Sequence, residues 1–141
     1  MCSISGICNF EKKPSIEIVE LMTKLLSHRG PDDSGFFQNE NVSFGHNRLS
    51  IIDLQNSKQP MKDNMNKNII IFNGEIYNFK ELKSDLQSLG HKFETEGDTE
   101  VILKSYNQWG IECLKKLEGM FVFCIWDNKK KQLFIGRDKF G

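Results

Sequence analysis

The most apolar run of the chain spans residues 120–126, with the sequence MFVFCIW. Its aromatic and β-branched residues favour a strand, and successive side chains of a strand point to opposite faces. Because both sets of side chains are apolar, other parts of the chain must cover both faces of this strand. Residues 127–131, DNKKK, predict a turn, after which Gln132–Arg137 returns as an antiparallel partner. The run therefore predicts a hairpin within a sheet that is buried on both sides.

The segments on either side of this hairpin form an irregular series of strands and helices. Apolar spacing predicts helices from Pro14-Ser15 to Gly30, from Asn78 to Leu89 and from Gly97-Asp98 to Gly110, and a shorter helical stretch over Cys113, Leu114 and Leu117. Further strands are predicted at Ile4–Phe10, Ser34–Gln38, Val42–Asn47, Asn68–Phe72 and Lys92–Thr95, with an exposed loop between Arg48 and Pro60. Hairpins mixed with helices in this way are typical of an α+β sandwich.

Composition excludes several classes of function. The chain has 141 residues, with 19 Lys+Arg against 19 Asp+Glu, so it carries no net formal charge, and we expect no nucleic-acid partner. The longest apolar run is far shorter than the roughly 20 residues of a membrane-spanning helix, and the N-terminus lacks the features of a signal peptide. We therefore expect one cytoplasmic domain over residues 1–141, with no membrane partner.

Cysteine usage singles out Cys2. The four cysteines show no CxxC spacing, and the other three lie in apolar strand or helix patterns. If Met1 is removed, Cys2 carries both a thiol and a free α-amine, and an α-amine with a pKa of about 7.7–8.0 suits a general base near neutral pH. The alternative is that position 2 simply holds a small residue. The three histidines lie far apart in the sequence without a partner at metal spacing, so we expect no metal site.

Other positions offer groups that a carbonyl substrate would need. The buried strand is expected to break at Asn73-Gly74-Glu75, where the Asn73 amide and the Gly74 N–H could hold an oxyanion, although a plain Asn-Gly turn is the alternative. Arg48 is one of only three arginines and suits a planar carboxylate. Asp98 could pair with an ammonium group, or it could cap the helix that begins there. An amino-acid substrate would use both Arg48 and Asp98.

These residues belong to a longer series of motifs. In chain order they are Met1-Cys2-Ser3-Ile4, Arg29-Gly30-Pro31-Asp32, Gly45-His46, Arg48-Leu49-Ser50-Ile51, Gln59-Pro60-Met61, Phe72-Asn73-Gly74-Glu75-Ile76-Tyr77-Asn78, Asp98-Thr99-Glu100-Val101, Gly119-Met120-Phe121 and Gly136-Arg137-Asp138. Through them the whole chain resembles the N-terminal glutaminase domain of the glutamine-dependent asparagine synthetases. These domains are class II glutamine amidotransferases of the N-terminal-nucleophile hydrolase superfamily.

The resemblance implies a four-layer αββα sandwich and a reaction. Met1 would be removed, and Cys2 would attack the side-chain amide of glutamine with its own α-amine as the base. Asn73 and the N–H of Gly74 would hold the oxyanion. Water would then release glutamate from the thioester.

The resemblance also implies how the substrate is held. Arg48 would bind the α-carboxylate of glutamine, while Asp98, Glu75 and backbone groups near Leu49 would bind its α-amine. Ammonia would pass to a C-terminal synthetase domain of the same chain, which would use ATP and Mg to amidate aspartate, whereas residues 1–141 would hold no cofactor. A homodimer is also compatible with the resemblance.

Two further expectations concern the extent of the protein and its acceptor. Because the sequence predicts that residues 136–141 end in a turn, at a point where the family's glutaminase domain continues, we expect the domain to be truncated at its C-terminus and the synthetase domain to be absent. One alternative is a related amidotransferase that acts on another carboxylate, such as that of a surface-polysaccharide sugar. The other is an inactive glutamine-binding fragment.

Overall fold

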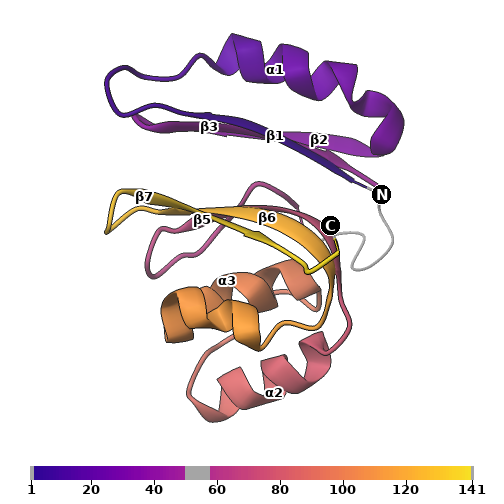
Figure 1. The fold of residues 1–141 in the computed structure, drawn as a ribbon, viewed down its shortest axis with the longest axis vertical. Helices are drawn as coiled ribbons and strands as arrows, with labels where there is room; N and C mark the ends of the chain where they lie inside the picture. Colours follow the sequence, from indigo (N-terminus) through magenta and orange to yellow (C-terminus); the bar gives the residue numbers. More distant parts are fainter. Residues whose placement is uncertain (1, 50–57, 141) are drawn as a thin grey trace.

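Within residues 2–49 and 58–140, which the computed structural model describes, two antiparallel sheets lie face to face and helices cover both outer faces (Figure 1). The first sheet, sheet A, has the strand order β1-β3-β2, and the second, sheet B, has the order β4-β5-β6-β7. The layers are therefore α1, sheet A, sheet B, and α2 with α3. This arrangement confirms the α+β class and the αββα sandwich.

Sheet A is formed by the N-terminal part of the chain. Its strands are β1 (Ser3–Cys8), β2 (Asp33–Gln38) and β3 (Val42–Arg48), and the predicted hairpin between β2 and β3 is confirmed. The helix α1 (Ile16–Leu25) lies on the outer face, and its N-terminus is capped by Ser15, whose hydroxyl accepts the N–H of Ile18 at 3.2 Å. A short 3₁₀ turn, η1 (Ser27–Arg29), follows before the chain enters β2.

Sheet B contains β4 (Met61–Lys62), β5 (Ile69–Ile76), β6 (Gly119–Asp127) and β7 (Gln132–Arg137). The predicted hairpin of residues 120–126 with 132–137 is confirmed by the pairing of β6 with β7. Phe121, Phe123 and Ile125 belong to the core on the helix side, whereas Trp126 belongs to the core between the sheets. Both faces of β6 are thus covered, because its two sets of apolar side chains serve two different cores.

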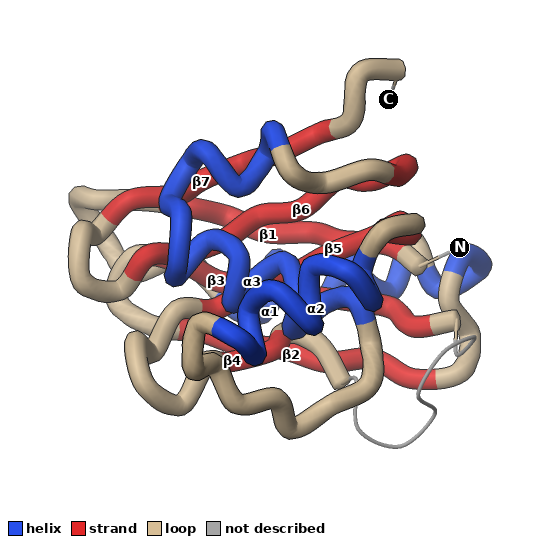
Figure 2. Tube along the Cα trace, turned by 90° about the horizontal axis from the view of Figure 1, so that it is seen from below, coloured by secondary structure: helices blue, strands red, loops and turns tan. Residues whose placement is uncertain are grey.

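The outer face of sheet B is covered by α2 (Phe79–Ser88), α3 (Asp98–Trp109) and the 3₁₀ helix η2 (Gly110–Lys115). Seen from below, α2 and α3 lie across the strands (Figure 2). Large apolar side chains fill this layer, among them Phe72, Leu86 and Ile102. In the part of the chain that the structure describes, no helix is long and apolar enough to cross a membrane.

One predicted strand, Lys92–Thr95, is wrong, because these residues form no ladder. Their backbone donors have another partner: the carboxylate of Glu100 accepts the N–H of Glu94 at 3.1 Å and that of Thr95 at 2.7 Å. A side chain from the first turn of α3 therefore replaces the neighbouring strand that these groups would otherwise need. Most of the predicted loop from Arg48 to Pro60 lies outside the described residues.

Candidate functional site

Sheet A sets Cys2 next to Arg48. β3 pairs with β1 through Ser3 and Asn47, and continuing this antiparallel register by one pair places Cys2 opposite Arg48. Side chains at alternate positions share a face, so Cys2 and Arg48 lie on the face of Ile4, which packs against the core between the sheets. Cross-strand neighbours have Cβ atoms about 4.5–5.5 Å apart. The thiol and the guanidinium therefore start from adjacent positions on the face that looks toward sheet B.

Both the side chain and the backbone of Cys2 are held. The N–H of Leu49 donates to the Cys2 Sγ at 3.4 Å, and the Sγ lies 3.7 Å from the Leu49 carbonyl oxygen. The Nε of Arg29 donates to the Cys2 carbonyl oxygen at 3.4 Å. These contacts hold Cys2, while its half-burial leaves part of the residue accessible to a substrate.

The segment that follows η1 closes over the end of β3. A Cβ on Gly30 would lie 2.6 Å from the Asn47 carbonyl oxygen and 2.7 Å from the Arg48 nitrogen, so no side chain fits there. The N–H of Asp32 donates to the Arg48 carbonyl oxygen at 3.0 Å. The Arg29-Gly30-Pro31-Asp32 motif thus has a structural role, because it contacts the backbone on both sides of Arg48 and holds it in place.

Asn73 and Gly74 do not end a strand. β5 continues through both residues to Ile76, with Gly74 paired with Phe121, so the predicted break and the alternative of a plain turn are both wrong. Gly74 has φ +147°, a backbone conformation that glycine adopts without strain. A Cβ there would lie 2.2 Å from the Met120 carbonyl oxygen. The glycine is required because the backbone of β6 passes too close for a side chain.

The stretch of β6 that pairs with this part of β5 is anchored by Asp138, the residue that follows β7. By period-two alternation the Asn73 side chain shares the face of Ile71, which packs in the core between the sheets and so looks toward sheet A. Opposite Gly74, the N–H of Phe121 donates to the Asp138 Oδ2 at 2.8 Å, and the Asp138 N–H donates back to the Phe121 carbonyl oxygen at 2.9 Å. Asp138 therefore fixes the strand against which Gly74 is packed.

Asp98 lies beside the end of β5. Its Oδ2 accepts the N–H of Ile76 at 3.1 Å, and the N-cap of α3 is Gly97, so the alternative role of Asp98 as a helix cap is wrong. Burial raises the pKa of Asp98, the N–H groups around it oppose that shift, and the charge of Glu75 raises the pKa further. An ammonium group placed near both carboxylates would relieve their mutual repulsion.

These groups gather at one end of the sandwich. β1 begins there and β3 and β5 end there, as Figure 1 shows. We call this region the site end; its residues are Cys2, Arg48, Leu49, Asn73, Gly74, Glu75 and Asp98. Together they offer a thiol, a guanidinium, an amide with a neighbouring backbone N–H, and two carboxylates. This set of groups matches an amino acid whose side chain carries a carbonyl.

Two residues of β3 to which sequence reasoning assigned no role in the site adjoin these groups. His46 is buried, burial lowers its pKa to about 4, and its Nε2 has no hydrogen-bond partner among the described residues. Asn47 is equally buried and faces α1, where its Nδ2 donates to the Ser3 Oγ at 3.0 Å and to the Thr23 carbonyl oxygen at 2.6 Å. The sequence contained one signal for a polar contact on this face, namely the serines at alternate positions of β1, Ser3 and Ser5.

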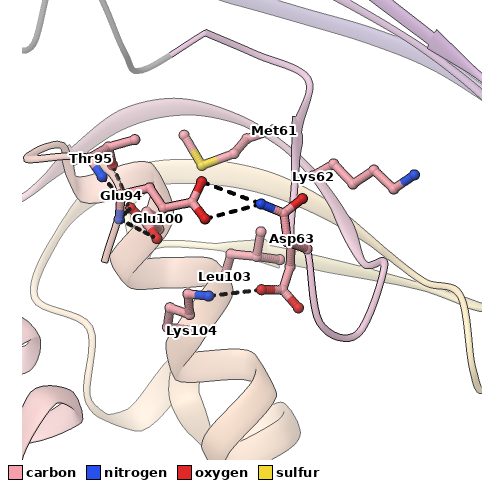
Figure 3. Close-up of a pocket in the computed structure, with 9 residues that line it drawn as sticks. Met61, Lys62, Asp63, Glu94, Thr95, Glu100, Leu103 and Lys104 are labelled. Carbon is pink, nitrogen blue, oxygen red and sulfur yellow. Dashed lines mark hydrogen bonds and ion pairs between the residues drawn. The ribbon is translucent and has the colours of Figure 1, made fainter. Parts of the chain in front are cut away.

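A separate pocket of about 120 Å³ lies between the loop after β4 and α3 (Figure 3). It contains none of the predicted site residues, and its polar groups bind one another: Lys104 Nζ donates to the Asp63 Oδ1 at 2.8 Å, and Asn64 Nδ2 donates to Glu94. Within residues 2–49 and 58–140, no group of three His, Cys, Asp or Glu side chains could hold a metal ion.

Comparisons with known proteins agree with this architecture. The family profile of the glutamine amidotransferase domain matches residues 1–141. The chain is 41% identical over 145 residues to glutamine-hydrolysing asparagine synthetase 3 of Bacillus subtilis, and 38% identical over 144 residues to asparagine synthetase B of Escherichia coli. Each alignment covers 100% of this chain but only 24% and 26% of those relatives, so the chain spans about a quarter of their length.

A solved structure shows the same fold. Glutamine phosphoribosylpyrophosphate amidotransferase from B. subtilis matches 98% of this chain and 37% of its own, with a TM-score of 0.74 and 21% sequence identity. At that identity the likeness concerns the fold alone. The profile match over the whole length, however, shows the family: this chain belongs to the glutamine amidotransferase domain family.

Proposed function

We propose that the chain hydrolyses glutamine to glutamate and ammonia with Cys2 as the nucleophile. The observation that carries the proposal is the position of the Cys2 sulfur, which accepts the N–H of Leu49 next to Arg48 at the site end. The other thiols are poor candidates: burial raises the pKa of Cys8, and it raises the pKa values of Cys113 and Cys124 to about 11. These three groups stay protonated near neutral pH, and a protonated thiol is a weak nucleophile.

The substrate is held at its two charged ends. Arg48 binds the α-carboxylate, because a guanidinium matches a planar carboxylate with two parallel hydrogen bonds. Asp98, Glu75 and the backbone at Leu49 bind the α-ammonium group, which offsets the repulsion between the two carboxylates. With both ends fixed, the side-chain amide of glutamine extends toward Cys2.

The chemistry needs no group from outside the chain except water. With Met1 removed, the α-amine of Cys2 takes the thiol proton as the sulfur attacks the amide carbon. The Asn73 Nδ2 and the Gly74 N–H stabilise the oxyanion of the tetrahedral intermediate. The protonated amine then gives its proton to the leaving ammonia, and a thioester remains. Water, deprotonated by the same amine, attacks the thioester, and the sulfur leaves and regains a proton as glutamate forms.

The fate of the ammonia is proposed from the relatives. Those that match along the whole of this chain are named as glutamine-hydrolysing asparagine synthetases and are about four times as long. We propose that a C-terminal segment of the complete protein uses the ammonia to amidate aspartate, with ATP and Mg²⁺ bound in that segment. No described residue of this chain is assigned to ATP or to the metal.

The test is glutamate release from glutamine by protein whose N-terminus has been identified by intact mass. Cys2→Ala should reduce release by roughly a thousandfold or more, because the thiol nucleophile is lost although the α-amine of residue 2 remains. Cys8→Ala, which removes a thiol at the last residue of β1, should keep the activity. A form that retains Met1 should lose about a hundredfold or more, since the Cys2 nitrogen is then an amide without basicity. Unchanged release by Cys2→Ala would overturn the proposal.

A further inference from the structure

The face of sheet A that packs under α1 carries a hydrogen-bonded row directly behind the site end. Ser3, Asn47 and Ser34 are cross-strand neighbours on β1, β3 and β2. The Asn47 Nδ2 donates to the Ser3 Oγ at 3.0 Å, and the Ser34 Oγ donates to the Asn47 Oδ1 at 2.8 Å. The same Nδ2 donates to the Thr23 carbonyl oxygen at 2.6 Å, which belongs to the last turn of α1. One side chain thus ties three strands to a helix.

This row is one residue away from the site on two strands. Ser3 follows Cys2, and Asn47 precedes Arg48, so the two site side chains leave the opposite face of the same short piece of backbone. The Ser3–Asn47 pair is the last of the register between β1 and β3, at the place where a strand terminus tends to fray. Whatever fixes this pair therefore fixes how the Cys2 sulfur sits relative to Arg48.

An amide is the side chain that satisfies these neighbours. Its two N–H bonds serve Ser3 and Thr23, and its oxygen serves Ser34, so both kinds of polar atom are used. Aspartate would set a carboxylate oxygen against the Thr23 carbonyl oxygen, and an apolar residue would leave buried polar atoms unpaired. Asn47 itself is only 1% exposed, so water cannot replace the lost bonds.

We propose that Asn47 is a positioning residue for the nucleophile: it locks the first pair of β1 and β3 and thereby holds the Cys2 sulfur in line with the substrate that Arg48 binds. The inference rests on the proposed glutaminase function. Asn47 touches neither substrate nor sulfur. Its effect passes through the backbone to Cys2, where a misplacement of about 1 Å can cost roughly a hundredfold in rate.

The chain offers a matched control on the same face. The Ser5 Oγ lies 2.7 Å from the Thr23 Oγ1, a buried polar contact to the same helix residue. Ser5 is paired with Gly45, two residues further along the ladder from the site. Ser5→Ala therefore removes a comparable bond between sheet A and α1 but leaves the Ser3–Asn47 pair intact.

The experiment compares Asn47→Ala, Ser34→Ala and Ser5→Ala with the wild-type protein in three measurements: thermal stability, kcat/KM for glutamine, and the rate at which iodoacetamide alkylates Cys2. We expect Asn47→Ala to lower kcat/KM by about 10- to 100-fold, yet to raise the alkylation rate because the sulfur is released from Leu49. Ser34→Ala, at an exposed residue, should also lower kcat/KM and raise the alkylation rate, and both changes should be smaller than in Asn47→Ala. Ser5→Ala should lower the melting temperature while keeping both rates within about twofold.

Each result bears on the proposal. Equal losses of kcat/KM in Asn47→Ala and Ser5→Ala, at similar melting temperatures, would show that Asn47 has only a structural role. An unchanged alkylation rate in Asn47→Ala would show the same. If Asn47→Ala does not fold, Ser34→Ala carries the test, because its side chain lies at the surface. A wild-type protein without glutamate release would overturn the proposed function, whereas the alkylation rates would still decide whether Asn47 positions Cys2.

Discussion

The two sheets meet their covering helices through different chemistry. Under α1, sheet A presents small polar residues, and their contacts with the helix are directional, such as the bond from Asn47 to the Thr23 carbonyl oxygen. Under α2 and α3, sheet B presents large apolar residues such as Ile70 and Phe72, which pack against Leu86 and other apolar side chains. Hydrogen bonds between particular atoms hold the first interface together, whereas close packing of large apolar side chains holds the second.

This difference between the two interfaces parallels the way in which the residues of the proposed site are divided between the two sheets. In the proposed site, sheet A supplies two side chains that must be correctly oriented, Cys2 and Arg48, whereas sheet B supplies the backbone N–H of Gly74, whose position is set by the pairing of β5 with β6. Hydrogen bonds fix distances within a few tenths of an ångström, but apolar cores accept swaps that conserve volume. We therefore expect the sheet A half to respond to the loss of single polar atoms, and the sheet B half to respond to changes of backbone shape.

The largest effect is expected from a backbone change in sheet B. Gly74→Ala should destabilise the protein by about 4 kcal/mol, since it combines a strained φ with a Cβ 2.2 Å from the Met120 carbonyl oxygen. Gly90→Ala is the matched control: Gly90 also has a positive φ, +92°, but no atom of the described residues lies within 4 Å of its Cβ position. It should cost only about 1 kcal/mol. Urea unfolding measures both, and equal losses would mean that the close approach of β6 does not matter.

The side chain next to Gly74 should affect chemistry rather than stability. Asn73→Ala removes a proposed oxyanion donor, so kcat for glutamine should fall by about 10²- to 10³-fold. Asn73 is half-buried, so its replacement should leave the free energy of unfolding nearly unchanged. Steady-state kinetics with a parallel melting curve separate the two effects. A rise in the half-saturation constant without a fall in kcat would assign Asn73 to binding instead.

Sequence reasoning succeeded where the signal was local and failed where a distant segment set the structure. The run over residues 120–126 predicted its own strand and both buried faces by alternation alone. Asn73-Gly74 resembled a turn, because a local pattern cannot reveal that β6 continues alongside and keeps Gly74 in the ladder. The strand at Lys92–Thr95 failed for the same reason, since its N–H groups bind a carboxylate from α3.

The site divides in the same way. Cys2 and Arg48 could be proposed from their chemistry and from the family motifs, without knowledge of the fold. Asn47 could not, because its role depends on α1 lying against sheet A and on the register of three strands. Asp98 was identified as a charge for the substrate, yet its bond to Ile76 at the end of β5 requires the contact between α3 and sheet B.

A buried titratable group makes the core between the sheets sensitive to acid. Burial lowers the pKa of His46 to about 4, below its ordinary value of 6.5, so the unfolded chain takes up this proton more readily than the folded one. The stabilising effect of the neutral imidazole is complete above pH 6.5 and is lost as the pH falls to about 4. The loss amounts to about 3 kcal/mol, at 1.36 kcal/mol per pKa unit.

The check is the free energy of unfolding as a function of pH. His46→Gln should flatten the curve between pH 6.5 and 4 relative to the wild type, because glutamine does not titrate. His28→Gln changes an exposed histidine and should leave the shape of the curve as it was. If the two variants give the same curve, the acid sensitivity arises elsewhere.

The guanidinium of sheet A should control binding. Arg48→Ala removes the proposed partner of the substrate carboxylate, and truncating one member of a desolvated charge pair typically costs about 2–5 kcal/mol. At the lower end this raises the glutamine concentration for half-saturation roughly 30-fold, at about 1.4 kcal/mol per tenfold. Arg137→Ala, at an exposed arginine of β7, should leave it unchanged. An unaltered half-saturation constant in Arg48→Ala would show that another group binds the carboxylate.

The smallest effect tests whether every polar group under α1 stabilises the fold. Ser43 is fully buried on this face, yet its hydroxyl has no hydrogen-bond partner among the described residues, whereas the Ser5 hydroxyl contacts that of Thr23. A buried hydroxyl without a partner carries a desolvation cost that alanine does not. Ser43→Ala should therefore stabilise the protein by about 1 kcal/mol, and Ser5→Ala should destabilise it by a similar amount. Melting curves of the two single variants and the double variant measure this, because the residues lie on adjacent strands. Destabilisation by Ser43→Ala would mean that its hydroxyl has a partner, such as a bound water, that holds α1 to sheet A.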